Sequence, residues 1–180
     1  MHITFRRLAL AIAATGALAF AAPAAASAAT AAPAAASAPG SVIGDPGVYL
    51  ANTPTLTLAA PNKVTTGKAA VLKTCLGNGN CAVTANLKTT ETFDFVASTT
   101  ATTGTMMRLH GTNWCVTNRG TAVFFEACQS FASQLWNGSG GVLTGVLTNA
   151  KTGLRLTHTA VAAYAPVQVS SQFTFWGNSS

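Results

Sequence analysis

Matching residues recur at a fixed spacing in the C-terminal part of this chain. The triplet Cys115-Val116-Thr117 aligns with Arg155-Leu156-Thr157, and Trp136 aligns with Trp176 at the same offset. Phe95 precedes Trp136 by nearly the same distance along the chain. A constant period of about 40 residues indicates a fold built from equivalent units that pack on one another. Counting back from the two clear units gives a third, so we predict three repeats of about 40–50 residues, at positions 45–95, 104–136 and 141–176.

The units are expected to consist of short β-strands. Only 8% of the residues are charged, which leaves too few Glu and Lys for a helical bundle. After residue 41, apolar and β-branched runs alternate with Gly, Asn and Thr, and no helical period is evident. The clearest runs are Gly47–Leu50, Thr55–Leu58, Ala69–Leu72, Thr105–Leu109, Trp114–Thr117, Ala122–Glu126, Val142–Thr148, Leu154–His158 and Val167–Ser170. We predict an all-β fold in which three units close on one another, with Phe95, Trp136 and Trp176 in the shared core.

The N-terminal part of the chain, up to position 44, differs in composition from the rest. Arg6 and Arg7 precede an apolar run, Leu8–Ala22, and small residues with A-x-A steps follow. This order predicts a secretory signal peptide over residues 1–28, which is cleaved. A membrane anchor is the alternative, but the run is shorter than the roughly 18 residues of a spanning helix. Residues 29–44, rich in Ala, Pro and Ser, are expected to link the signal to a folded domain at 45–180.

Export would leave a small and scattered charge. Without Arg6 and Arg7 the chain keeps eight basic and four acidic side chains, a net charge of +4. The basic residues occur singly along the sequence, whereas a nucleic-acid-binding surface usually gathers them on one face beside aromatic side chains. We therefore expect a secreted, extracellular monomer with no nucleic-acid partner and no membrane span in its mature form.

The four cysteines are Cys75, Cys81, Cys115 and Cys128. An even number in an exported chain indicates disulfides, and four cysteines allow three pairings. Short separations favour Cys75–Cys81 and Cys115–Cys128. A zinc site is the alternative, but the chain has no C-x-x-C spacing, so we expect no bound metal.

Few residues are suited to catalysis. The acidic residues are limited to Asp45, Glu91, Asp94 and Glu126, and hydrolysis needs two carboxylates or a nucleophile with a base. An Asp/His/Ser set drawn from Asp94 and His110 has no supporting spacing, and no Gly-rich phosphate loop is present. We therefore predict that the protein is not an enzyme and binds no cofactor.

The middle unit resembles the ricin-type β-trefoil lectin domain. The family pattern is a C-L-D strand, a G-x-x-V-Q-L-W-x-C strand, and a Q-x-W motif six positions past the second cysteine. This chain has Cys115-Val116-Thr117, then Gly120–Cys128, then Gln134-Leu135-Trp136. The outer units match less closely and end in Phe93-Asp94-Phe95 and Phe175-Trp176. The resemblance implies a β-trefoil and supports a disulfide within the middle unit.

The resemblance also implies where a sugar would bind. In the family, the Asp of C-L-D, the Gln and the aromatic of V-Q-L-W, and an Asn beside Q-x-W hold the sugar. The corresponding residues here are Thr117, Phe124, Glu126 and Ser133 in the middle unit, and Thr157, Gln168 and Ser170 in the third. In the first unit the Asp position lies near Leu58, with Val71 and Lys73 facing the place of the pocket. Most of these depart from the family, so a sugar pocket would be rebuilt. Candidate sugar contacts are Asn113, Thr117, Asn118, Arg119, Glu126 and Gln134, with Gln168 in the third unit.

Two functions are compatible with these sequence features. The first is a secreted carbohydrate-binding, lectin-like module that recognises a polysaccharide or glycan. The second is a secreted β-trefoil that has lost sugar binding and recognises an extracellular protein, for example as a protease inhibitor. The loop between Cys75 and Cys81 would then be the presented surface. Sugar recognition is the commonest use of this trefoil type and favours the first function.

Overall fold

The computed structural model describes residues 42–43, 46–62, 67–98 and 103–179. The predicted signal peptide lies outside the described residues, as does the predicted linker apart from one short strand. The described residues form three short 3-10 turns, at Leu76–Asn78, Thr84–Asn86 and Ala132–Gln134, and the following strands. These are β1 Val42–Ile43, β2 Val48–Leu50, β3 Thr53–Ala59, β4 Lys68–Ala69, β5 Val71–Thr74, β6 Phe93–Ala97, β7 Thr105–Leu109, β8 Trp114–Arg119, β9 Ala122–Ala127, β10 Leu135–Gly138, β11 Gly145–Asn149, β12 Arg155–His158, β13 Val167–Ser170 and β14 Phe175–Asn178.

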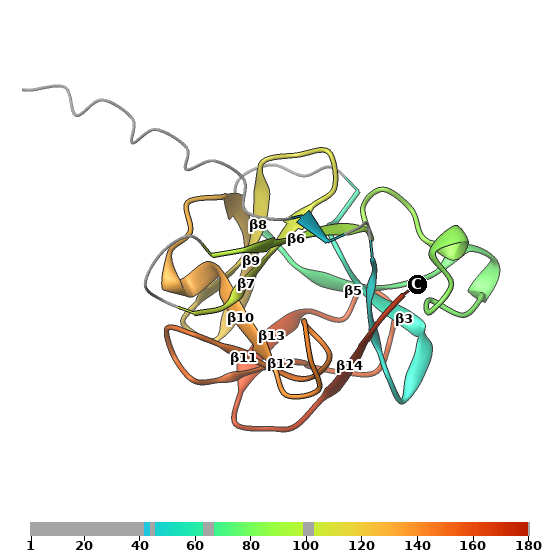
Figure 1. Ribbon diagram of the computed structural model, residues 1–180. Coiled ribbons are helices and arrows are strands. Elements are labelled where there is room, and N and C mark those ends of the chain that lie inside the picture. The colour runs from blue at the N-terminus through green and yellow to red at the C-terminus, as the bar shows by residue number, and fades with distance from the viewer. Residues whose placement is uncertain (1–41, 44–45, 63–66, 99–102, 180) are drawn as a thin grey trace, which may run out of the picture. The chain divides into compact units, whose positions relative to one another are not determined.

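Six of these strands close into a barrel (Figure 1). Strand β6 pairs with β7, β7 with β10, β10 with β11, β11 with β14, and β14 with β2, all antiparallel. A bridge between Gly47 and Thr92 joins the start of β2 to the start of β6 and completes the ring. Each unit gives two strands to this ring, so every unit has both of its neighbours as partners and no barrel strand is left at an open edge.

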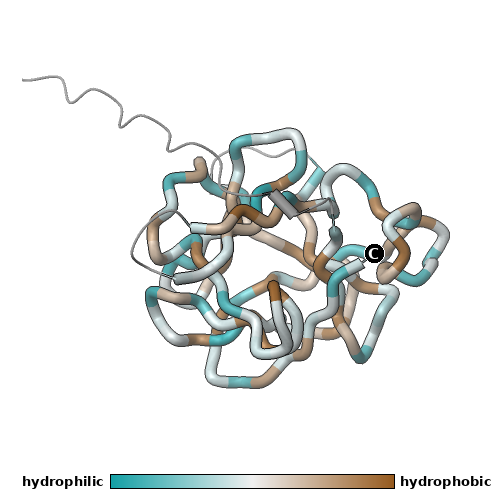
Figure 2. Tube along the Cα trace, viewed as in Figure 1, coloured by the Kyte–Doolittle hydropathy of each residue, from teal (hydrophilic) through white to brown (hydrophobic). Residues whose placement is uncertain are grey.

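Three β-hairpins complete the three units, and their registers are equivalent. They consist of β3 with β5, β8 with β9, and β12 with β13. The Cα pairs at the centre of each hairpin match in position, and all six side chains are buried: Leu58 with Leu72, Val116 with Phe125, and Leu156 with Val169. Figure 2 shows the resulting pattern, in which short hydrophobic stretches alternate with hydrophilic turns along the chain.

The hairpins meet through backbone hydrogen bonds between units. The Ala70 amide donates to the Val123 carbonyl at 2.8 Å, and the Val169 amide donates to the Thr121 carbonyl at 2.8 Å. The circle closes where the Val167 amide donates to the Ala70 carbonyl at 3.0 Å. These bonds also explain a difference from the expected run Ala69–Leu72. That run is divided between β4 and β5, because Ala70 bonds to the two other hairpins.

The repeated tryptophans have the same role in their units. The indole nitrogen of Trp136 donates to the Val116 carbonyl at 3.0 Å, and that of Trp176 donates to the Leu156 carbonyl at 3.0 Å. Both rings are buried in one core cluster that also contains Phe95 at the matching place in the first unit. The repeat in the sequence is therefore also a repeat of contacts.

The disulfides pair as the short separations favoured, Cys75 with Cys81 and Cys115 with Cys128. The second bond ties strand β8 to the segment that follows β9. In the third unit Arg155 stands at the place of Cys115 and makes a comparable link. Its guanidinium donates to the Ser171 carbonyl and lies 3.9 Å from the centre of the Phe173 ring. A stacked arginine therefore connects the same two segments that a disulfide connects in the middle unit.

We expect Trp136→Phe and Trp176→Phe to destabilise the protein equally. Each change removes the indole donor and leaves a buried carbonyl without its partner, at a cost of about 2–4 kcal/mol. Urea denaturation would measure this cost. Trp114→Phe is the control, because Trp114 is only partly buried and its indole donates to no described residue, and a loss below about 1 kcal/mol is expected. Clearly unequal losses at the two core tryptophans would contradict their equivalence.

Candidate functional site

The middle-unit residues that the resemblance singled out are largely engaged with one another. Gln134 is buried, and its side-chain nitrogen donates to Thr117 Oγ1 at 3.1 Å and to the Ala127 carbonyl at 2.8 Å. Its side-chain oxygen accepts the Gln129 amide at 2.7 Å. The Gln134 side chain therefore connects the loop before β10 to the β8–β9 hairpin. Thr117, which it contacts, is also buried.

Asn118 lies on the other face of strand β8. It is buried, and its Nδ2 donates to Asn149 Oδ1 at 3.2 Å and to Thr152 Oγ1 at 2.9 Å, both in the third unit. Successive side chains on a strand point to opposite faces, so Asn118 does not share a surface with Thr117 or Arg119. Asn113 is exposed, and its carbonyl accepts the Cys128 amide at 3.1 Å. The structure gives both asparagines structural contacts and does not bring them to one site.

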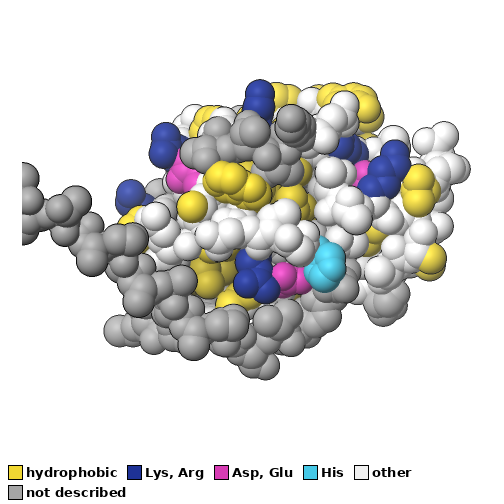
Figure 3. All heavy atoms as spheres, turned by 90° about the horizontal axis from the view of Figure 1, so that it is seen from above, with side chains coloured by type: hydrophobic (Ala, Val, Ile, Leu, Met, Phe, Trp, Pro, Cys, Tyr) yellow, Lys and Arg dark blue, Asp and Glu magenta, His cyan; other side chains and the backbone are white. Residues whose placement is uncertain are grey.

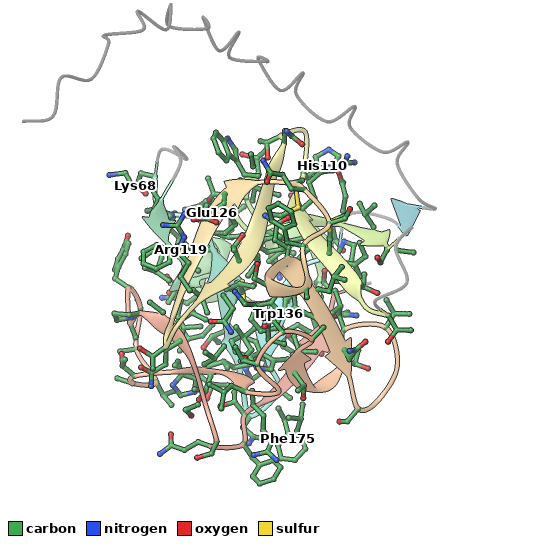
Figure 4. All side chains as sticks on the ribbon, turned by 90° about the vertical axis from the view of Figure 1, so that its left-hand side faces the viewer. Lys68, His110, Arg119, Glu126, Trp136 and Phe175 are labelled. Carbon is green, nitrogen blue, oxygen red and sulfur yellow. A yellow bond between two sulfur atoms is a disulfide. The ribbon has the colours of Figure 1, made fainter. Side chains whose placement is uncertain are left out.

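Glu126 and Arg119 form an ion pair on the outer face of the β8–β9 hairpin. Arg119 Nε lies 2.6 Å from Glu126 Oε1. Figure 4 shows both side chains beside Lys68 of strand β4, which runs next to β9 with Lys68 opposite Phe125. A ligand hydroxyl at Glu126 would have to compete with this guanidinium.

In the third unit, the residues at the corresponding positions also contact other residues of the protein. Gln168 is half-buried. It pairs with Thr157 of its own hairpin on one side and with Ala122 of the middle unit on the other. Thr157 Oγ1 lies 2.8 Å from Thr174 Oγ1. This contact is equivalent to the one between Thr117 and Gln134 in the preceding unit. In the third unit as well, the residue at the position of the family's aspartate is therefore engaged within the protein and not available to a sugar.

Hairpin register locates the equivalent positions in the first unit. The pair of Thr57 and Lys73 corresponds to Cys115 and Glu126, and the pair of Ala59 and Val71 corresponds to Thr117 and Phe124. The aspartate position is therefore Ala59, next to Leu58, in agreement with the expected position near Leu58. The Ala59 methyl group makes no hydrogen bond with the adjoining loop, and Lys73 stands at the family's aromatic position.

A half-open cavity of about 400 Å³ lies beside Lys73, and we call it the first-unit pocket. The volume suits a small ligand at the lower end of the usual range. Every lining side chain carries a hydrogen-bonding group, and none is Asp, Glu, His or Cys: Asn62, Lys73, Thr74, Lys88, Thr89, Thr90 and Tyr164. The resemblance predicts Lys73 at the pocket position, but it predicts none of the other lining residues.

Lys73 contributes a buried cation to the first-unit pocket. Its residue surface is only 8% exposed, and Nζ donates to Asn62 Oδ1 at 3.3 Å and to Thr90 Oγ1 at 3.5 Å. Burial lowers the pKa of the Lys73 ammonium, the negative charge of Glu91 raises it in part, and Lys88 lowers it further. The ammonium is thus poorly solvated and only weakly hydrogen-bonded.

Tyr164 brings an aromatic ring to the first-unit pocket from the third unit. It is 67% exposed, and its backbone amide donates to the Leu72 carbonyl of β5 at 2.7 Å. Its φ angle is +65°, in the left-handed region that a bulky residue seldom adopts. The sequence signal for this residue is the loop between Thr157 and Gln168, which is longer than the corresponding loop between Thr117 and Phe124.

A second cavity, of about 510 Å³, lies against β10, β11 and β14, and we call it the aromatic pocket. Phe173 and Phe175 line it and are 66% and 51% exposed, with Arg155 stacked on Phe173. Figure 4 places Phe175 at the end of the molecule opposite Arg119 and Glu126. This pocket is wider open than the first-unit pocket and has fewer polar side chains, among them Asn137 and Thr148.

The structure also brings Asp94 and His110 together, with Arg108 beside them. Asp94 Oδ1 lies 2.8 Å from His110 Nδ1, and Arg108 Nε donates to Asp94 Oδ2 at 2.9 Å. Burial alone would raise the pKa of the Asp94 carboxyl, but hydrogen bonds and charge from His110 and Arg108 outweigh it and lower this pKa.

Figure 3 shows basic side chains spread over one face of the molecule, with acidic ones beside several of them. In the described part of the chain, no three His, Cys, Asp or Glu residues are grouped to hold a metal.

Comparison with known proteins shows the fold. No protein-family model matches the chain, and no curated protein matches it by sequence. Among solved structures, a designed three-fold symmetric protein, ThreeFoil, matches with a TM-score of 0.61 at 12% identity, over 77% of this chain and 99% of that one. The β-trefoil lectin of the Vibrio vulnificus hemolysin/cytolysin, solved with N-acetyl-D-lactosamine bound, matches with a TM-score of 0.51 at 14% identity, over 75% and 93% of the two chains. A cytolethal distending toxin chain from Actinobacillus actinomycetemcomitans matches with a TM-score of 0.53 at 10% identity, over 73% and 88%. The chain therefore has the β-trefoil fold, consistent with a ricin B-like domain.

The lowered pKa of Asp94 predicts a pH-dependent contribution to stability. The folded protein holds the ionised carboxyl, so its stabilising effect is complete above the ordinary Asp pKa of about 4 and is lost as the pH falls through the lowered value. We expect Asp94→Asn to cost about 1–3 kcal/mol at pH 7, and the difference from the unchanged protein to shrink in strongly acidic buffer. Urea denaturation at several pH values would measure this.

Arg119→Gln is the matched control, because it breaks an ion pair whose guanidinium is largely exposed. Such pairs contribute about 0–1 kcal/mol. An Asp94→Asn cost that stayed constant from neutral to strongly acidic pH would contradict the assigned ion pair.

Proposed function

We propose that this protein is a secreted, non-catalytic carbohydrate-binding module whose sugar site is the first-unit pocket. The observation that carries the proposal is the lining of that pocket, in which hydroxyl, amide and ammonium groups converge beside an exposed aromatic ring. A sugar presents hydroxyl groups around its ring and apolar C–H groups on its faces. Converging hydrogen-bonding groups and an aromatic face match these two features.

The position of the pocket supports the same function. The pocket includes Lys73, which stands at the hairpin position of the family's sugar-stacking aromatic, and it is assembled from the β5 strand, Asn62, the loop before β6 and Tyr164. In the middle and third units the corresponding position is filled by the Thr117–Gln134 and Thr157–Thr174 contacts. The first unit therefore offers the site that its two copies have closed.

The conformation of Tyr164 is a second support. A left-handed φ at a bulky residue costs free energy, of the order of 1 kcal/mol, and such residues gather at functional sites. Tyr164 buries little of its side chain, so packing does not account for its presence. A ligand stacked on its ring would account for it.

Further features of the described residues support secretion and a non-catalytic role. The protein has two disulfides, and disulfides are typical of proteins in oxidising compartments outside the cytosol, which supports export. None of the helical segments in the described residues is long and apolar enough to cross a membrane. The pocket lining has no carboxylate, so it lacks the pair of carboxyl groups with which most glycoside hydrolases cleave sugars.

Protein recognition is the second candidate, and exposed apolar side chains favour it. The segment between β5 and β6 carries the Cys75–Cys81 disulfide, and Leu76 and Val83 lie exposed on it. Figure 1 shows this segment projecting from the barrel. A partner protein would then bind Leu76 and Val83, and glycans would not compete with it.

Binding of the oxidised protein to a glycan array, followed by calorimetric titration, tests the proposal. We expect Asn62→Ala and Tyr164→Asn to weaken sugar binding by roughly 5- to 30-fold, since each removes about 1–2 kcal/mol of contact. Tyr164→Asn should leave the unfolding free energy within about 1 kcal/mol, because Asn tolerates a positive φ.

Phe173→Ala in the aromatic pocket is the matched control and should leave affinity unchanged. Loss of binding in Phe173→Ala alone would move the sugar site to the aromatic pocket. Folded protein that binds no glycan would overturn the proposal in favour of protein recognition through Leu76 and Val83.

A further inference from the structure

We propose that the first-unit pocket selects saccharides that carry a negatively charged group, a carboxylate or a sulfate, over their neutral counterparts. The inference rests on the proposed function and names its ligand class. Two ammonium groups line the pocket, and no acidic side chain does. A sugar whose anionic group reaches Lys73 would give this buried cation the charged partner that the described residues do not supply.

The Lys73 ammonium has only weak hydrogen-bond partners. An ammonium has three N–H donors, and Lys73 directs hydrogen bonds to two neutral oxygens, at 3.3 and 3.5 Å. Both distances exceed those of a strong charge-assisted bond, which are about 2.7–2.9 Å. Within the described residues, no Asp or Glu oxygen lies in ion-pair range of Lys73 Nζ. A buried cation with long, neutral contacts has room for a better acceptor.

The charges near Lys73 are unevenly placed around the pocket. Lys88 also lines the pocket and is exposed at its mouth, and its charge disfavours the charged form of Lys73. Glu91 offsets part of this effect, but its carboxylate is fully buried and accepts the Lys88 backbone amide at 2.9 Å. Glu91 does not line the pocket, so the ligand meets two cations and no anion.

Neutral and anionic sugars would interact differently with Lys73. A neutral sugar would give Lys73 further hydroxyl acceptors of the kind that Asn62 and Thr90 already provide. A carboxylate or sulfate would give it a charged acceptor inside a partly enclosed site, where such bonds are roughly twice as strong as neutral ones. Tyr164, Thr89 and Thr90 would still bind the ring, so sugar and anion are recognised together.

A purely structural role for Lys73 makes a different prediction. In that case its ammonium only cross-links Asn62 and Thr90, and the charge of the ligand has no effect on affinity. Comparing ligands that differ only in charge therefore separates the two roles.

The experiment is a calorimetric titration of the full protein with matched ligand pairs at near-physiological ionic strength. One pair is an oligogalacturonide and its methyl ester, which masks the carboxylate and keeps the ring hydroxyls. The other is a sulfated galactan oligosaccharide and its desulfated form. Inorganic sulfate alone is the control for a simple anion site. We expect at least one anionic member to bind tenfold or more tightly than its neutral partner.

Three variants locate the effect. Lys73→Gln should reduce the preference for the anionic member tenfold or more, and Lys88→Gln should reduce it severalfold, with the larger effect at low salt. Lys68→Gln removes the same charge from an exposed site on β4 and should leave the preference unchanged. Thermal unfolding of each variant checks that it is folded, and Lys88→Gln provides the test if Lys73→Gln does not fold.

The outcomes separate this inference from the proposed function. Equal binding of both members of each pair, with loss in Tyr164→Asn, overturns the anion preference and leaves carbohydrate binding in place. Binding of inorganic sulfate with no sugar bound overturns both. An anion preference that survives in Lys73→Gln and Lys88→Gln overturns the assignment to this pocket.

Discussion

The closure of three units on one another is the constraint on which the rest of this structure depends. Each unit places two strands in the barrel, and these strands have partners in both neighbouring units. The hairpins meet in the same way, through amides and carbonyls of residues such as Ala70, Val123 and Val169. A single unit would leave these groups unpaired, so the fold becomes stable only when all three are present.

Within this repeated frame, the same place has three different chemistries. The middle unit fills its hairpin position with Gln134 and Thr117, and the third fills it with Thr157 and Thr174. The first unit has Ala59 there, and a cavity opens beside Lys73. Pseudo-symmetry therefore fixes where a ligand site can form, while a few side chains decide in which unit it remains open.

The sequence predicted the fold better than the site. Spacing alone located Trp136 and Trp176, and both make the same indole-to-carbonyl bond. The candidate contacts came from the unit that most resembles the lectin pattern, but there the polar groups are engaged, Asn118 with Asn149 and Glu126 with Arg119. Resemblance is strongest where residues hold the unit together, so it identified structural residues more readily than ligand contacts.

The sequence by itself determined the number of units, their β character and the aromatic core positions, and it favoured the local disulfide pairs without choosing among the three pairings. All of these follow from periodicity, composition and short separations, which are properties of neighbouring residues. Only the tertiary structure decided where the pocket lies. Lys73 and Thr90 belong to the first unit and Tyr164 to the third, and they meet because the Tyr164 amide bonds to the Leu72 carbonyl. Contacts between units depend on how the whole barrel closes, and no local pattern in the sequence records them.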